Sequence, residues 1–224
     1  MPPEQVQSYL IEAFKQWGMP KSIRVDNGMP LGDPQRKSIP ILALWIEAMG
    51  VQVIFNRPRR PTDNAKVERM QRTTKNWAEV EQCQNYGQLK SYLMSACMIQ
   101  REHFKVTRLG GKTRKDYFPE LYTNTNNYHY TLFEPKKAYQ RLSKWTFARK
   151  TSKIGQFSLY GQTYYLGKVF AKQYVAIQFD PEHQQWKVKD SNGDPIKAFH
   201  AINFDHANLW NLTLCQRTPK KAQT

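Results

Sequence analysis

Helices and strands alternate in the first 55 residues, and this order restricts the fold more than any other feature of the sequence. Apolar residues at three- and four-residue steps predict one helix over residues 3–17 and another over residues 42–49. A short apolar run follows each helix, at Ser22–Val25 and at Val51–Phe55, and each run predicts a strand. The order helix, strand, helix, strand indicates an α/β layer with crossover connections.

A basic loop and two further helices follow this layer. Two prolines keep residues 56–61 out of regular structure, and Asp63 or Asn64 is suited to cap the next helix. A second helix is predicted from Tyr86 to His103. The residues predicted to face a core are Val67, Met70, Thr74 and Trp77 in the first helix and Leu89, Leu93, Ala96 and Cys97 in the second.

The apolar period changes to two after Lys153, which predicts short antiparallel strands. Turn sequences at residues 160–162, 180–183 and 191–194 separate the strands, as in a small antiparallel β-barrel. We therefore expect four segments. Residues 1–121 hold the α/β layer and the helices that follow it, 122–153 form a basic linker, 154–204 form the small β-barrel domain, and 205–224 form a tail. The apolar residues that define the strands are Phe157, Leu159, Tyr165, Val175, Ile177, Phe179, Trp186, Val188, Ile196 and Phe199.

The charge of the chain favours an anionic partner. Lys and Arg number 34 against 18 Asp and Glu, which gives a net charge of +16, and a polyanion would bind such a chain with release of counterions. Double-stranded DNA is the leading candidate, and a membrane is not expected, because the longest apolar run is only Ile41–Ile46. Residues 136–153 hold seven Lys or Arg with three aromatic residues, which suits either a DNA track or an amphipathic connector helix.

The location and redox state follow from the absence of familiar signals. The sequence starting at Met1 has neither the basic start nor the apolar stretch of a secretory signal, so we expect an intracellular, cytoplasmic and DNA-associated protein. The three cysteines, Cys83, Cys97 and Cys215, are odd in number and widely spaced. Neither a disulfide nor a zinc site is therefore expected.

Two carboxylates are placed where metal-dependent chemistry on nucleic acid would need them. Asp26 follows the predicted strand Ser22–Val25, and Glu68 lies on the first turns of a basic helix. Mg²⁺ prefers hard carboxylate oxygens, and two such ions can stabilise both the attacking and the leaving oxygen of a phosphodiester. The simpler alternative is that Asp26 starts an Asp-Asn-Gly turn and that Glu68 pairs with Arg72.

Several motifs in one order resemble a known family. These are Ile23-Arg24-Val25-Asp26-Asn27-Gly28, Gly50-Val51-Gln52-Val53-Ile54-Phe55, Pro58 to Pro61, and Asn64-Ala65-Lys66-Val67-Glu68-Arg69 followed by Arg72-Thr73-Thr74-Lys75. Together they resemble the catalytic core of integrases and transposases that use an Asp, Asp, Glu triad, over roughly residues 3–100. Residues 167–199 resemble the small C-terminal barrel of transposases in that superfamily.

The resemblance implies a ribonuclease-H-like fold with Mg²⁺ or Mn²⁺ as cofactor. Asp26 would be the second aspartate of the triad, Glu68 the glutamate, and Asn64 would shape the start of the helix. The spacing between Asp26 and Glu68 is longer than the commonest retroviral spacing and favours the bacterial insertion-sequence branch. The basic residues expected to contact DNA are Arg57, Arg59, Arg60, Lys66, Arg69, Arg72 and Lys75, with Asn64 beside them.

The sequence departs from the family at its start. The first three strands of the core, and the aspartate that the first of them carries, should precede residues 3–17, yet no Asp occurs before Asp26. We therefore expect an N-terminally truncated copy whose status as an enzyme is open. One hypothesis is metal-dependent cleavage and joining of DNA by a homo-multimer once the site is completed. The alternative is an inactive DNA-binding remnant that occupies element ends or interferes with an intact transposase.

Overall fold

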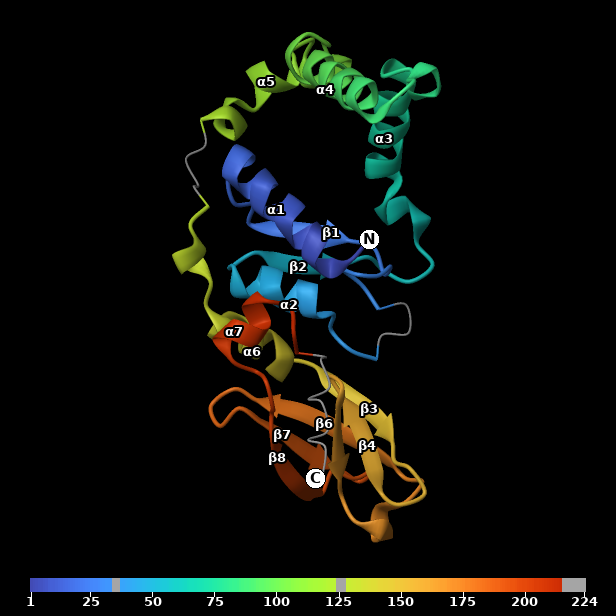
Figure 1. The fold of residues 1–224 in the computed structure, drawn as a ribbon, viewed down its shortest axis with the longest axis vertical. Coiled ribbons are helices and arrows are strands. Elements are labelled where there is room, and N and C mark those ends of the chain that lie inside the picture. Colours follow the sequence, from blue (N-terminus) through green and yellow to red (C-terminus); the bar gives the residue numbers. More distant parts are fainter. Residues whose placement is uncertain (34–36, 124–127, 215–224) are drawn as a thin grey trace, which may run out of the picture. The chain divides into compact units, whose positions relative to one another are not determined.

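The computed structural model describes residues 1–33, 37–123 and 128–214. The chain divides into two compact units, which are described separately. Unit 1 comprises residues 1–11, 20–55 and 129–224, and unit 2 comprises residues 12–19 and 56–128. Figure 1 shows the elements and their labels. The fold is mixed α/β, as the sequence predicts.

Unit 1 contains the predicted alternation of helix and strand. Helix α1 spans Pro3–Trp17 and continues into unit 2, strand β1 spans Ser22–Val25, α2 spans Ile41–Ala48 and β2 spans Gln52–Phe55. Strands β1 and β2 pair in parallel, and α2 is the crossover between them. Because α2 is apolar except for Glu47, it is largely buried, and Leu42, Trp45 and Ile46 are at most 1% exposed.

The antiparallel part of unit 1 begins earlier than the sequence predicts. The expected basic linker contains α6, Pro135–Ser143, and β3, Thr146–Lys150, which pairs with β6. One sheet has the order β3-β6-β7-β8, and β4 and β5 form a separate hairpin. The bounds of the other strands are β4 Gln156–Leu159, β5 Gln162–Tyr165, β6 Tyr174–Asp180, β7 Gln185–Lys189 and β8 Pro195–His200.

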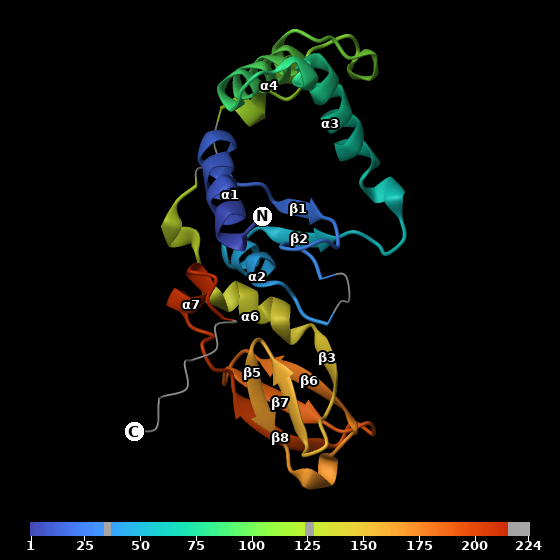
Figure 2. The same ribbon diagram turned by 45° about the vertical axis from the view of Figure 1, so that its right-hand side comes forward.

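Aromatic side chains fill the interior beneath this sheet. The Trp186 ring is stacked with Tyr160 at 5.8 Å between centroids and meets Phe179 edge-on at 4.9 Å. Buried Tyr139 and Phe147 belong to the same interior. The connector interpretation of residues 136–153 is therefore supported for α6, whereas two of the three aromatic residues proposed for a DNA track are core residues. Figure 2 shows α6 between α2 and the sheet.

The segment expected to be a tail is partly folded. Helix α7 spans His206–Trp210, and its Trp210 ring lies edge-on to Trp45 at 6.1 Å. Leu209 and Leu214 are fully buried. Residues 215–224, including Cys215, lie outside the described part of the chain, whereas Cys83 and Cys97 are free thiols.

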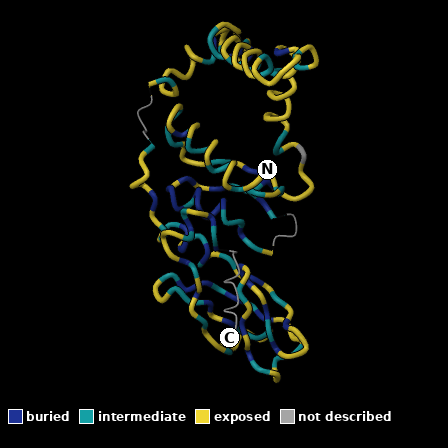
Figure 3. Tube along the Cα trace, viewed as in Figure 1, coloured by how far each residue is buried: buried dark blue, intermediate teal, exposed yellow. Residues whose placement is uncertain are grey.

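Unit 2 is helical and much less buried. Helix α3 spans Ala65–Trp77, α4 spans Tyr86–Glu102 and α5 spans Arg114–Tyr117, with short 3-10 turns at Pro61–Asp63 and Thr107–Leu109. The sequence places the first two helices correctly. Its prediction of a buried stripe on α3 is wrong, because no residue of that helix is buried. Figure 3 shows this contrast between the exposed α3 and the buried α2.

Candidate nucleic-acid interface

The first candidate carboxylate, Asp26, lies in unit 1 directly after β1. The backbone N–H of Gly28 donates a hydrogen bond of 2.9 Å to Asp26 Oδ1, which closes a local Asx turn. A Cβ atom at position 28 would lie 3.2 Å from the same oxygen, so glycine permits this close approach. The turn predicted as the simpler alternative is therefore present, and the exposed side chain still offers its second carboxylate oxygen to solvent.

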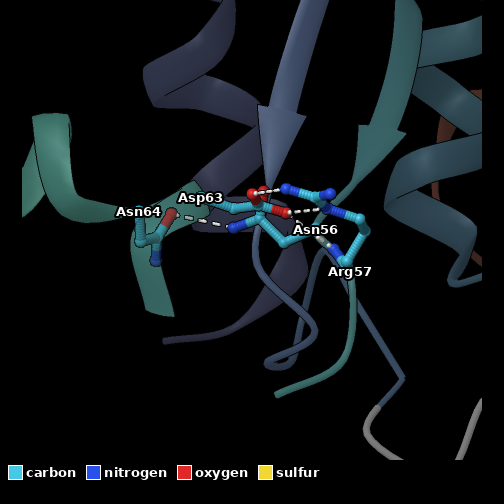
Figure 4. A network of polar contacts seen from close by, with 4 residues as sticks. All are labelled: Asn56, Arg57, Asp63 and Asn64. Atoms are coloured by element: carbon cyan, nitrogen blue, oxygen red, sulfur yellow. Dashed lines mark hydrogen bonds and ion pairs between the residues drawn. The ribbon is translucent and has the colours of Figure 1, made fainter. Parts of the chain in front are cut away.

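A network of four polar side chains fixes the loop that leads into α3 (Figure 4). Arg57 donates from Nη2 to Asp63 Oδ1 at 2.7 Å and from Nε to Asp63 Oδ2 at 3.1 Å. Asn56 Nδ2 donates to Asn64 Oδ1 at 2.9 Å. Two residues on one side of the loop are thus joined to two residues at the start of the helix.

This network changes the role expected for Arg57. Its hydrogen bonds to Asp63, followed by the attraction of the two charges, raise the pKa of the Arg57 guanidinium above its usual value. The charge is partly neutralised inside the loop, whereas Arg59 and Arg60 are exposed on the same loop. Asn64 occupies the N-cap position of α3 without a capping hydrogen bond from its side chain, because the side-chain oxygen accepts from Asn56 instead.

Helix α3 presents its basic side chains to solvent. Lys66, Arg69 and Arg72 are all exposed, and Lys75 forms only a long ion pair with Glu81 at 3.9 Å. The apolar residues that were predicted to be buried are also accessible, with Val67 48% and Met70 56% exposed. A 13-residue helix with no buried residue leaves its basic side chains accessible to an anionic partner.

The second candidate carboxylate, Glu68, is exposed in the first turn of α3 and belongs to unit 2. Its predicted pairing with Arg72 is not among the ion pairs of the described residues. Within residues 1–33, 37–123 and 128–214, no group of three or more His, Cys, Asp or Glu side chains could hold a metal ion. Carboxylate oxygens such as those of Asp26 and Glu68 are of the kind that Mg²⁺ prefers as ligands.

Two basic residues that the sequence did not single out lie near α3. Arg108 and Arg114 line one cavity together with Lys66 and Arg69. They are far from α3 along the chain and follow no recognisable spacing relative to it, so no sequence pattern could have identified them. All four cations belong to unit 2, and its tertiary fold brings the two arginines to the lysine and arginine of α3.

No protein-family model matches the chain. Among the described residues, no helix is both long enough and apolar enough to cross a membrane.

Proposed function

We propose that this protein binds double-stranded DNA as part of a machinery for DNA transposition or integration. The observation that carries the proposal is the exposure of α3. This helix has four basic residues, none of its residues is buried, and the loop before it carries the exposed Arg59 and Arg60. DNA backbone recognition depends on such exposed cations, because each neutralised phosphate releases counterions. A protein that used these residues for packing would bury part of the helix.

The α/β part of unit 1 supports the placement in the transposase and integrase class. Asp26 directly follows β1, which pairs in parallel with β2 across the buried crossover α2. This arrangement is compatible with part of a ribonuclease-H-like core, and the antiparallel strands β3 to β8 are compatible with a small barrel. We propose that Asp26 and Glu68 each supply a carboxylate to the metal-dependent chemistry of this class and that the protein acts on element ends as a homo-multimer.

In that class of reaction, divalent ions stabilise the charge that develops on the attacking and leaving oxygens. The second candidate function is DNA binding without cleavage. The exposed basic residues of α3 serve both functions equally. The two functions are distinguished by whether the protein cleaves DNA when a divalent metal ion is added.

The test uses the full chain and a fluorescent DNA duplex. Binding is measured by anisotropy over a range of salt concentrations. The logarithm of the association constant should fall linearly with the logarithm of the salt concentration, with a slope of about −0.9 for each phosphate neutralised. The same binding should be unaffected by EDTA. Binding that is absent at low salt, or that does not change with salt, would refute the proposal.

Catalysis is tested separately by incubation of supercoiled DNA with Mg²⁺ or Mn²⁺. Nicking that Glu68→Gln abolishes and that the matched Glu79→Gln retains would establish the metal-dependent function. Both glutamates are exposed in unit 2, so the two variants differ mainly in position. DNA binding without any nicking would leave the second candidate function.

A further inference from the structure

Unit 2 contains a cavity of about 410 Å³ that is lined by four cationic side chains and no acidic one. Two of the cations, Lys66 and Arg69, are three residues apart on α3 and therefore lie on one side of the helix. The other two, Arg108 and Arg114, come from the segment after α4. Thr62 and Thr73 add hydroxyl groups to the same lining.

Arg114 is fixed in place by a chain of hydrogen bonds that crosses three helices. Its Nη1 donates to the backbone oxygen of Gln100 at 2.6 Å. The Gln100 side chain, which belongs to a residue only 7% exposed, donates to Thr74 Oγ1 at 2.8 Å. These bonds tie α5 to α4 and α4 to α3. The guanidinium is thus held in position before any ligand arrives, and its remaining N–H groups are available for a ligand.

Two acidic residues that lie close along the chain to the lining residues Gln100 and Arg114 are engaged with other partners. Glu102 pairs with Lys115 at 3.2 Å, and Asp116 accepts a hydrogen bond from the Thr113 hydroxyl at 2.7 Å. None of the ion pairs among the described residues involves a cation of the cavity. Four positive charges around one small space repel each other, and an anion with several acceptor oxygens would relieve this repulsion.

We propose that this cavity binds a phosphodiester group of the DNA backbone, with Arg114 as the fixed donor and Arg108 as a second new contact. This inference rests on the proposed DNA-binding function and extends it beyond α3. Arg114 would donate to a non-bridging phosphate oxygen, while Lys66, Arg69 and Arg108 surround the charge. The site would hold the backbone in register on α3 without reading its sequence.

The test compares two double variants that remove the same charge. Arg108→Gln with Arg114→Gln removes the two cations from the cavity, and Lys105→Gln with Lys112→Gln removes two exposed lysines of the same segment that do not line it. Duplex DNA binding by the full chain is measured by anisotropy over a range of salt concentrations. The cavity variant should lower affinity by about tenfold or more and reduce the salt slope by about 2. The lysine variant should change both quantities less.

Circular dichroism of each variant shows whether unit 2 is still folded. Because Arg114 takes part in the hydrogen bonds of α4, the single variant Arg108→Gln provides a second measurement that leaves those bonds intact. It should reduce the salt slope by about 1. A slope unchanged in both arginine variants, while the wild type binds DNA, would overturn the inference and leave the proposed function standing. No salt-dependent binding by the wild type would overturn both.

Inorganic phosphate distinguishes DNA from a small ligand of the same chemistry. The wild-type chain is titrated with inorganic phosphate by calorimetry, beside the arginine variants. Weak binding of free phosphate together with the DNA defect supports a backbone contact. Tight phosphate binding that the arginine variants lose, with DNA affinity unchanged, would overturn the DNA assignment.

Discussion

The Asp180 carboxylate at the end of β6 offers a sharp test of what stabilises the antiparallel sheet. Its side chain is 8% exposed and accepts from Lys187 Nζ at 2.7 Å, and from His183 Nδ1 and the backbone N–H of Glu182 at 3.0 Å each. The hydrogen bond from Lys187 is the largest influence on this group, and the pKa of Asp180 lies well below its usual range. The folded protein therefore stabilises the charged carboxylate form of Asp180.

Substitution of Asp180→Asn keeps an oxygen for the turn but removes the negative charge. A hydrogen bond to a charged group contributes about 1.5–3 kcal/mol to stability. Because the Lys187 side chain is 57% exposed, solvent weakens the pair, and we expect a loss at the lower end, about 1.5 kcal/mol at pH 7. The matched change Asp194→Asn, at an exposed aspartate in the same sheet region, should cost less than about 0.5 kcal/mol.

The pH dependence gives the sign of the effect. A carboxylate whose folded-state pKa is depressed stabilises the protein above its unfolded pKa, about 3.9, and this contribution is lost as pH falls through the folded pKa. Urea unfolding followed by circular dichroism at pH 6, 4 and 2 should show the gap between wild type and Asp180→Asn shrinking below pH 4. A gap of constant size, or one no larger than that of Asp194→Asn, would refute the reasoning.

Two further predictions concern packing and the loop before α3. Leu142 is fully buried on α6, so Leu142→Ala should lower the free energy of unfolding by about 2–5 kcal/mol. In the same urea experiment, Lys144→Ala, at the exposed C-cap of α6, should change it by less than about 0.5 kcal/mol. Asn64→Ala removes one hydrogen-bond acceptor of the Asn56 amide, whose residue is 5% exposed, and should destabilise unit 2 by about 1 kcal/mol with faster hydrogen exchange over residues 56–64. Equal exchange in Asn64→Ala and in Gln71→Ala would contradict a structural role for this bond.

Apolar periodicity predicted the positions of the helices and strands better than it predicted which of them are buried. Strands β1 and β2 and the helix between them match their predicted positions because short apolar runs with Gly and Pro boundaries are unambiguous. Strand β3 was missed because Phe147 is its only buried residue and its other side chains read as a basic connector. The stripe on α3 was predicted correctly as a helical face, but periodicity does not say whether anything covers that face.

In the candidate site, the residues that lie in short local motifs could be predicted, and those that the tertiary fold brings together could not. Asp26, Glu68 and the basic residues of α3 follow from short motifs that are local in sequence. The pairing of Arg57 with Asp63 could have been anticipated from the opposite charges at the two ends of one short loop. The contribution of Arg108 and Arg114 could not, because it depends on how the segment after α4 folds back beside α3.

The exposure of α3 would make the stability of unit 2 dependent on the proposed DNA ligand. A helix of 13 residues is marginal by itself, and α3 gains little from burial. A polyanion that binds only the folded helix would stabilise it by mass action, in proportion to the logarithm of ligand concentration over the dissociation constant. Binding of the proposed DNA ligand and helix formation in unit 2 would then be one coupled equilibrium, and a salt concentration that releases the ligand would also allow the helix to fray.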